Sequence, residues 1–119
     1  MIEISIPGYA KLAFQHLVLD YNGTLACDGA LRTGVADALR VLVGSLRLHI
    51  VTGDTFGKAC SALAGLACMA STFPVENQSR RKQDYVEKLG AARTACIGNG
   101  RSDRLMFEAA ALAVAVVHE

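Results

Sequence analysis

The sequence predicts an α/β fold in which helices cover both faces of a doubly wound parallel sheet. Short apolar runs alternate along the chain with segments of helical periodicity, and the connections between them are short. A strand that is buried on both faces forms a continuous apolar run bounded by turn residues, and the run 17–19 before Asp20 has this form. The 119 residues fit one domain, 1–119, whose core needs no disulfide or metal.

The strands are expected in the following order. Residues 1–6 alternate apolar and polar side chains and stop at Pro7-Gly8, which predicts a short antiparallel edge strand that turns back. The first central strand follows within 11–20. Later strands are expected at 48–51, 68–73, 94–97 and 113–117.

Helices are expected between these strands. In 34–46, the apolar residues Val35, Leu39, Leu42, Val43 and Leu46 form one helical stripe. Further helices are expected at 56–66, 82–89 and 103–111, with Gly90 as a C-cap. Only about one helix fits between successive strands, so the chain has no room for an inserted cap domain.

Composition and charge exclude several classes of function. Apolar residues make up 52% and charged residues 19% of the chain, and the net charge is +1. These values give no case for a nucleic-acid or membrane partner, and Met1-Ile2-Glu3 does not begin a secretory signal, so we expect a cytoplasmic protein. The four cysteines show no CxxC pair and are expected to be reduced thiols.

Polar residues follow three of the predicted strands, and these residues are our candidates for a functional site. Asp20, Thr52 and Asn99 end strands, Asp103 lies one helical turn after Asn99, and Lys82 opens a helix. Carboxyl ends of parallel strands lie at one edge of a sheet, so these side chains can converge. Gly23, Gly53, Gly98 and Gly100 would let backbone N–H groups approach a ligand closely.

This set of side chains suits a phosphoryl group on a divalent ion. Asp20 and Asp103 supply hard oxygens for Mg²⁺, which takes one or two carboxylates and keeps several waters. Thr52 and Lys82 would hold phosphate oxygens. The alternative for Asp20 alone is that it only caps a helix or starts a turn.

Four segments in the same order resemble the four motifs of the haloacid dehalogenase-like superfamily of phosphotransferases. They are LVLDYNGTL (17–25), IVTGD (50–54), Lys82 and IGNGRSD (97–103). The group that the chain resembles most is the soluble P-type ATPase-like proteins. The resemblance implies a Rossmann-like core and an aspartyl phosphate at Asp20, with phosphate held by Asn22, Gly23, Thr52, Gly53 and Lys82, and Mg²⁺ by Asp20, the Asn22 carbonyl, Asn99 and Asp103.

Two residues depart from the usual pattern of the superfamily. Its phosphatases usually carry an Asp as general acid and base two residues after the nucleophile, and here that position is Asn22. The first carboxylate of the fourth motif is also an amide, Asn99. The resemblance therefore implies a slow Mg²⁺-dependent phosphohydrolase or phosphotransferase.

Two other functions remain open at this point. A phosphate- or Mg²⁺-binding module without turnover would keep the same pocket. A receiver domain of signalling also uses Asp, Thr and Lys, but its acidic pair precedes the phospho-acceptor, whereas here the phospho-acceptor motif comes first. A site without a cap domain can accept a large phosphorylated substrate, or a neighbouring subunit can cover it. We therefore expect a homo-oligomer.

Overall fold

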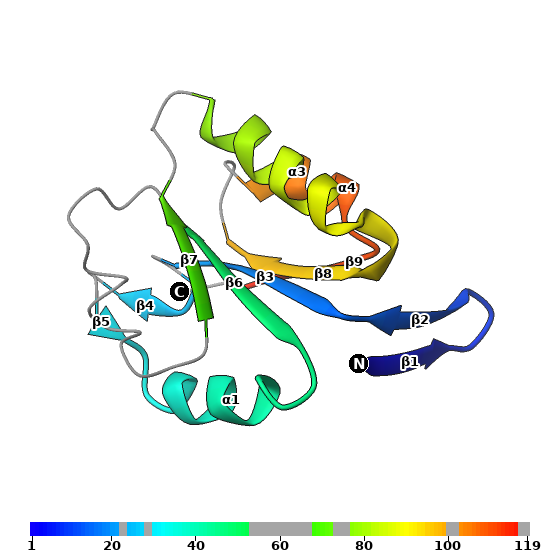
Figure 1. The fold of residues 1–119 in the computed structure, drawn as a ribbon, viewed down its shortest axis with the longest axis horizontal. Helices are drawn as coiled ribbons and strands as arrows, with labels where there is room; N and C mark the ends of the chain where they lie inside the picture. Colours follow the sequence, from blue (N-terminus) through cyan, green and yellow to red (C-terminus); the bar gives the residue numbers. More distant parts are fainter. Residues whose placement is uncertain (22–23, 28–29, 53–67, 73–76, 100–102, 117–119) are drawn as a thin grey trace.

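The centre of the fold is a parallel sheet of five strands, and this confirms the predicted fold class. The computed structural model describes residues 1–21, 24–27, 30–52, 68–72, 77–99 and 103–116. The strands of the main sheet are β3 (His16–Asp20), β6 (Arg47–Thr52), β7 (Cys68–Thr72), β8 (Thr94–Gly98) and β9 (Leu112–Ala115). Their order is β7-β6-β3-β8-β9 and every pair is parallel, so the sheet is doubly wound from the central strand β3 (Figure 1).

Helices cover both faces of this sheet. Helix α1 (Val35–Leu42) lies on one face, and α3 (Gln78–Leu89) and α4 (Arg104–Ala109) lie together on the other (Figure 1). Side chains alternate along a strand, so Leu17 and Leu19 of β3 join the core under α1, and Val18 joins the core under α3 and α4. The predicted stripe of α1 packs into the first of these cores.

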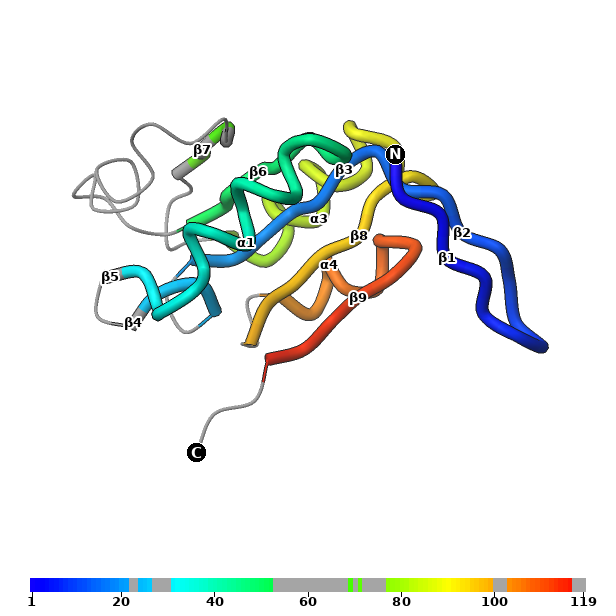
Figure 2. The backbone as a smooth tube through the Cα atoms, turned by 90° about the horizontal axis from the view of Figure 1, so that it is seen from below, coloured from blue at the N-terminus to red at the C-terminus, as the bar shows by residue number. Residues whose placement is uncertain are grey.

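The N-terminal strand turns back as predicted, but it is not an edge strand of the main sheet. Strand β1 (Ile2–Ile6) pairs antiparallel with β2 (Ala10–Phe14) in a separate two-stranded sheet that projects from the body (Figures 1 and 2). Strand β2 runs directly into β3, and β3 already has β6 and β8 on its two sides. The main sheet therefore has no free position beside β3 for β1.

A second short hairpin was not predicted. Strands β4 (Ala26–Cys27) and β5 (Ala30–Leu31) pair between β3 and α1. Two-residue strands are too short to show the alternation that marks a strand in sequence.

The bounds of the helices differ modestly from the prediction. Helix α3 begins at Gln78, four residues before Lys82. The sequence pattern missed this first turn because it carries exposed residues such as Arg80 and Arg81 and has no apolar stripe. It ends at Gly90, whose positive φ of 102° favours glycine, and a short 3₁₀ turn, η1 (Ala91–Arg93), leads into β8. The helix expected at 56–66 lies outside the described residues.

Two further observations concern the core and the membrane. Cys96 is a free, buried thiol, and burial raises its pKa to about 12, so it stays protonated near neutral pH.

Among the helices that the structure describes, none combines the length and the apolar character needed to cross a bilayer.

Candidate active site

The candidate site is built around Lys82, whose ammonium joins two carboxylates. Its Nζ lies 3.0 Å from Oδ1 of Asp20 and 2.7 Å from Oδ1 of Asp103. Lys82 is 1% exposed and Asp103 0%, so both ion pairs are nearly dry. Three residues spread over 84 positions of the chain, 20 to 103, are thus in direct contact.

Each of these side chains is held by a different element. Asp20 is the last residue of β3, at the carboxyl end of the central strand. Lys82 lies in the second turn of α3, on the face that also buries Val86 against the sheet. Asp103 is the N-cap residue of α4, just after β8. Strand ends and helix starts therefore converge at one edge of the sheet, as the sequence predicted.

Asp103 is held by the end of β8 as well as by Lys82. The backbone N–H of Asn99 donates to Oδ2 of Asp103 at 3.1 Å. A Cβ atom placed on Gly98 would lie 2.6 Å from Cγ of Asp103, closer than nonbonded carbons approach. The sequence suggested that Gly98 lets backbone approach a ligand; in the structure its missing side chain makes room for Asp103.

Thr24 belongs to the same cluster, although the sequence did not single it out. Its Oγ1 lies 3.4 Å from Oδ2 of Asp20 and 3.4 Å from Oδ1 of Asn99. One hydroxyl proton can be donated to only one of these acceptors at a time. The turn that places Thr24 is closed by its own N–H, which donates to the Tyr21 carbonyl at 3.2 Å. A polar side chain in the turn after the central strand was the available signal.

Burial and the charge of Asp103 act on the pKa of Asp20 in one direction, and the charge of Lys82 acts in the other. Burial raises the pKa of Asp20 above its ordinary value of 3.8; the ammonium of Lys82 lowers it, and the charge of Asp103 raises it further. With both carboxylates ionised, the cluster has two negative charges and one positive charge. Such a cluster attracts a cation before it attracts an anion.

The remaining predicted residues are placed as follows. Thr52 is buried at the end of β6, the neighbour of β3, at the same edge of the sheet. Asn99 follows β8 and is exposed as a residue, and its side chain reaches Thr24. Asn22, Gly23, Gly53 and Gly100 lie outside the described residues.

The donors at this edge fit a hard divalent cation. No group of three or more His, Cys, Asp or Glu side chains that could hold a metal is found within the described ranges. Mg²⁺ needs no such group, since it takes one or two carboxylates and keeps several waters. The adjacent carboxylates of Asp20 and Asp103, with the amide oxygen of Asn99 nearby, provide that chemistry.

Comparison with solved structures identifies the fold. The chain superposes on a putative HAD family hydrolase from Streptomyces avermitilis with a TM-score of 0.70 at 17% identity, covering 87% of this chain and 67% of that one. It superposes on the cobalt-bound deoxy-D-mannose-octulosonate 8-phosphate phosphatase from Haemophilus influenzae with a TM-score of 0.68 at 16% identity, covering 84% and 67%. It superposes on a putative 3-deoxy-D-manno-octulosonate 8-phosphate phosphatase from Vibrio cholerae with a TM-score of 0.66 at 16% identity, covering 92% of this chain and 74% of that one. The chain has the haloacid dehalogenase-like fold that its motifs implied.

One curated protein is related to this chain in sequence. No family model matches the sequence. An uncharacterized protein of Methanocaldococcus jannaschii is 38% identical over 39 residues, which are 33% of this chain and 89% of that protein. The chain belongs to the same family as this archaeal protein. The closer resemblance to soluble P-type ATPase-like proteins stays a prediction.

Proposed function

We propose that this protein is a Mg²⁺-dependent phosphohydrolase or phosphotransferase that acts through an aspartyl phosphate at Asp20. The observation that carries the proposal is the ammonium of Lys82 between the carboxylates of Asp20 and Asp103. The fold is shared with a phosphatase solved in a cobalt-bound form and with a putative phosphatase, which supports the reaction class. The substrate would be a phosphorylated molecule, large enough to reach an uncapped site, in the cytoplasm.

The proposed reaction has two transfers of the phosphoryl group. In the first, a carboxylate oxygen of Asp20 attacks phosphorus, the bond to the leaving oxygen breaks, and that oxygen takes up a proton. In the second, water attacks the same phosphorus and loses a proton, and the bond to Asp20 breaks to release inorganic phosphate. Lys82 balances negative charge on Asp20 and on the phosphoryl group, and Thr52 donates to a phosphoryl oxygen.

Mg²⁺ would be held by Asp20, Asp103, Asn99 and the Asn22 carbonyl. When bound, it supplies positive charge that draws the phosphate to a cluster otherwise negative overall. The hydroxyl of Thr24, donating to Asp20, would orient that carboxylate for attack. Asp103 holds Lys82 in place while Asn99 N–H holds Asp103.

Asn22 sets the expected speed of the reaction. An amide cannot move a proton to the leaving oxygen or from the attacking water, and a positioned general acid and base contributes ~10²–10⁴-fold. The protein should therefore form its aspartyl phosphate, or bind beryllium fluoride in its place, more readily than it turns over.

The test is hydrolysis of an activated aryl phosphate with Mg²⁺ saturating in every variant. Wild type should turn over slowly, Asn22→Asp about 10²-fold faster or more, and the nearly isosteric Asp20→Asn not at all. An Asp20→Asn variant as active as wild type would refute the proposal.

The second candidate is a phosphate- or Mg²⁺-binding module without turnover, which the amides at Asn22 and Asn99 favour. If Asn22→Asp folds and binds Mg²⁺ in calorimetry yet gains no turnover, while wild type still binds beryllium fluoride, this second function is the better one. If neither Mg²⁺ nor beryllium fluoride binds, both candidates are wrong.

A further inference from the structure

A second concave site lies at the opposite edge of the sheet from Asp20. A pocket of about 520 Å³ opens at the amino ends of β3 and β6, where His16 and Arg47 are paired residues of neighbouring strands. The turn 43–46 after α1, Gln15 and Met1 complete its wall. Its volume falls within the range of small-molecule sites, which is about 300–1,000 Å³.

The charged groups around this pocket are positive. Arg47 is the charged side chain among its lining residues, and none of these residues is acidic. Arg93 lies close by, since its carbonyl accepts the N–H of Gln15 at 2.9 Å. Burial lowers the pKa of His16, and the charges of Arg47 and Arg93 lower it further, so the ring is neutral near neutral pH.

The end of α1 does not cancel this potential. The C-terminal carbonyls of a helix repel anions unless they are hydrogen-bonded. Here the N–H groups of Ser45 and Leu46 both donate to the Leu42 carbonyl at 2.9 Å, and the Met1 ammonium donates to the Ser45 carbonyl at 2.6 Å. Within the described residues, the guanidinium of Arg47 forms no ion pair that would occupy it.

We infer that this pocket binds a small anion, a carboxylate or a phosphate group, through Arg47 and His16. A guanidinium offers two parallel N–H donors to either group, and charge-assisted bonds of this kind are about twice as strong as neutral ones. His16 adds a donor that needs no extra proton. Its Nδ1 lies 3.1 Å from Nε2 of His49, so Nε2 is the nitrogen left for a ligand.

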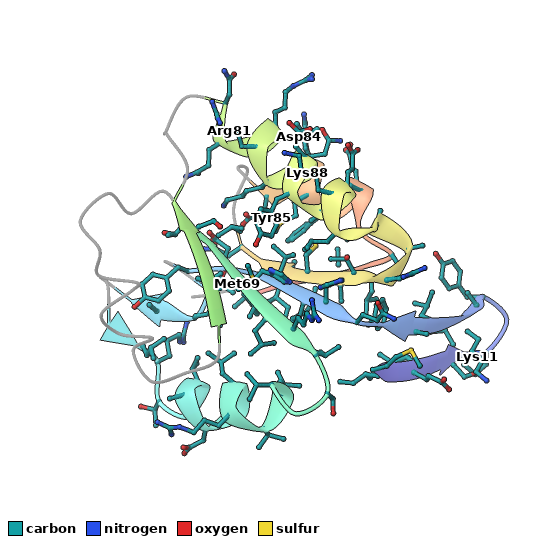
Figure 3. All side chains as sticks on the ribbon, in the orientation of Figure 1. Lys11, Met69, Arg81, Asp84, Tyr85 and Lys88 are labelled. Carbon is teal, nitrogen blue, oxygen red and sulfur yellow. The ribbon has the colours of Figure 1, made fainter. Side chains whose placement is uncertain are left out.

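The histidine pair links the pocket to the helix that carries Lys82. Nδ1 of His49 lies 2.8 Å from the hydroxyl of Tyr85, one turn after Lys82 on α3. Figure 3 shows Tyr85 between α3 and the sheet, whereas Arg81 and Asp84 lie on the outer side of the helix. An anion that accepts a hydrogen bond from Nε2 of His16 fixes the direction of the hydrogen bonds in this row: the Tyr85 hydroxyl donates to His49, and His49 donates to His16.

The test follows the imidazole nitrogens of His16 and His49 by NMR, without Mg²⁺. Succinate and inorganic phosphate are added separately up to about 20 mM, which detects millimolar affinities. We expect saturable shifts at both histidines and an affinity at least about 10-fold lower in Arg47→Gln, the loss of about 1.4 kcal/mol. The matched control is Arg40→Gln, an exposed arginine of α1 paired with Asp37 outside the pocket.

Each result decides the inference. Saturation by succinate alone identifies a carboxylate site, saturation by phosphate alone a phosphate site, and saturation by both a general anion site, provided that Arg47→Gln weakens it. Absence of shifts with either probe overturns the inference. So does equal binding by wild type and Arg47→Gln, or equal weakening by Arg40→Gln.

Discussion

Lys82 is the residue on which the candidate site depends most. Lys82→Met leaves the buried carboxylates of Asp20 and Asp103 without the ammonium that pairs with both. Removing one partner of a buried ion pair costs about 3–5 kcal/mol of stability. We expect the free energy of unfolding, measured by urea denaturation, to fall by that amount.

Two variants separate this cause from a general loss of helix stability. Lys88→Met, at an exposed position of the same helix, should change stability by no more than about 0.5 kcal/mol. Adding Asp103→Asn to Lys82→Met should recover part of the loss, because it removes one of the two repelling charges. A double variant no more stable than Lys82→Met alone would show that charge repulsion is not the cause.

Gly98 gives a second prediction at the residue scale. The methyl group of Gly98→Ala would overlap the carboxylate of Asp103 and force it to move, and overpacking of this kind costs about 1–3 kcal/mol. Calorimetry should also show weaker Mg²⁺ binding, since Asp103 is a proposed ligand. In Gly44→Ala the new methyl group meets only the Val41 carbonyl at 3.5 Å, so this control should keep both properties. A stable Gly98→Ala that binds Mg²⁺ like wild type would contradict the role given to this glycine.

At the scale of elements, α3 is attached to the sheet by a buried polar contact as well as by Val86. His49 is 2% exposed, and its ring lies edge-on to Tyr85 and bonds its hydroxyl. Burial, with the charges of His16 and Arg47, lowers the pKa of His49 to about 4. The ring is therefore neutral in the folded protein near neutral pH.

This contact predicts a particular dependence of stability on pH. Between the pKa of about 6.5 in the unfolded chain and about 4 in the folded protein, only the unfolded state binds the proton of His49. The free energy of unfolding should then decline as the pH falls from about 6.5 to about 4. In His49→Gln this decline should be shallower, which urea denaturation at several pH values measures. Identical slopes in the two proteins would mean that His49 does not titrate as described.

The sequence predicted most of these elements, and the reasons for its failures are physical. Continuous apolar runs such as 17–19 mark strands buried on both faces, so the parallel sheet was predictable. The placement of β1 was not, because alternation describes a strand's faces and not its neighbours. The first turn of α3 carries no apolar stripe, and β4 and β5 are too short to show the alternation of apolar and polar residues that marks a strand.

The candidate site was predictable where residue type and strand ends coincide, as at Asp20 and Asn99. Its three-way contact at Lys82 was not, since no local pattern gives a distance between side chains on β3, α3 and α4. Thr24 was missed for the same reason: its partners Asp20 and Asn99 lie four and 75 positions away.

At the scale of the whole molecule, the two ends of the described chain expose apolar residues on strands. Strand β9 is the last strand of the main sheet, and Val114 on it is 44% exposed. The hairpin of β1 and β2 exposes Ile4 at 37% and Tyr9, in its turn, at 73%. An edge strand has unpaired backbone N–H and C=O groups that can pair with a strand of another chain. Exposed apolar side chains on the same element favour this association further.

We therefore expect a homodimer in solution in which β9 of one copy pairs with β9 of the other around a twofold axis. Light scattering at micromolar concentration should return about twice the monomer mass of 12.6 kDa. Val114→Lys places a charge on this edge and should return the monomer mass, as charged side chains do on natural edge strands. The matched control is Val41→Lys, since Val41 is 77% exposed on α1, and it should leave the dimer intact. A wild type that stays monomeric up to about 100 μM would exclude a dimer of useful affinity, and loss of the dimer in the Val41 variant alone would place the interface on α1 instead.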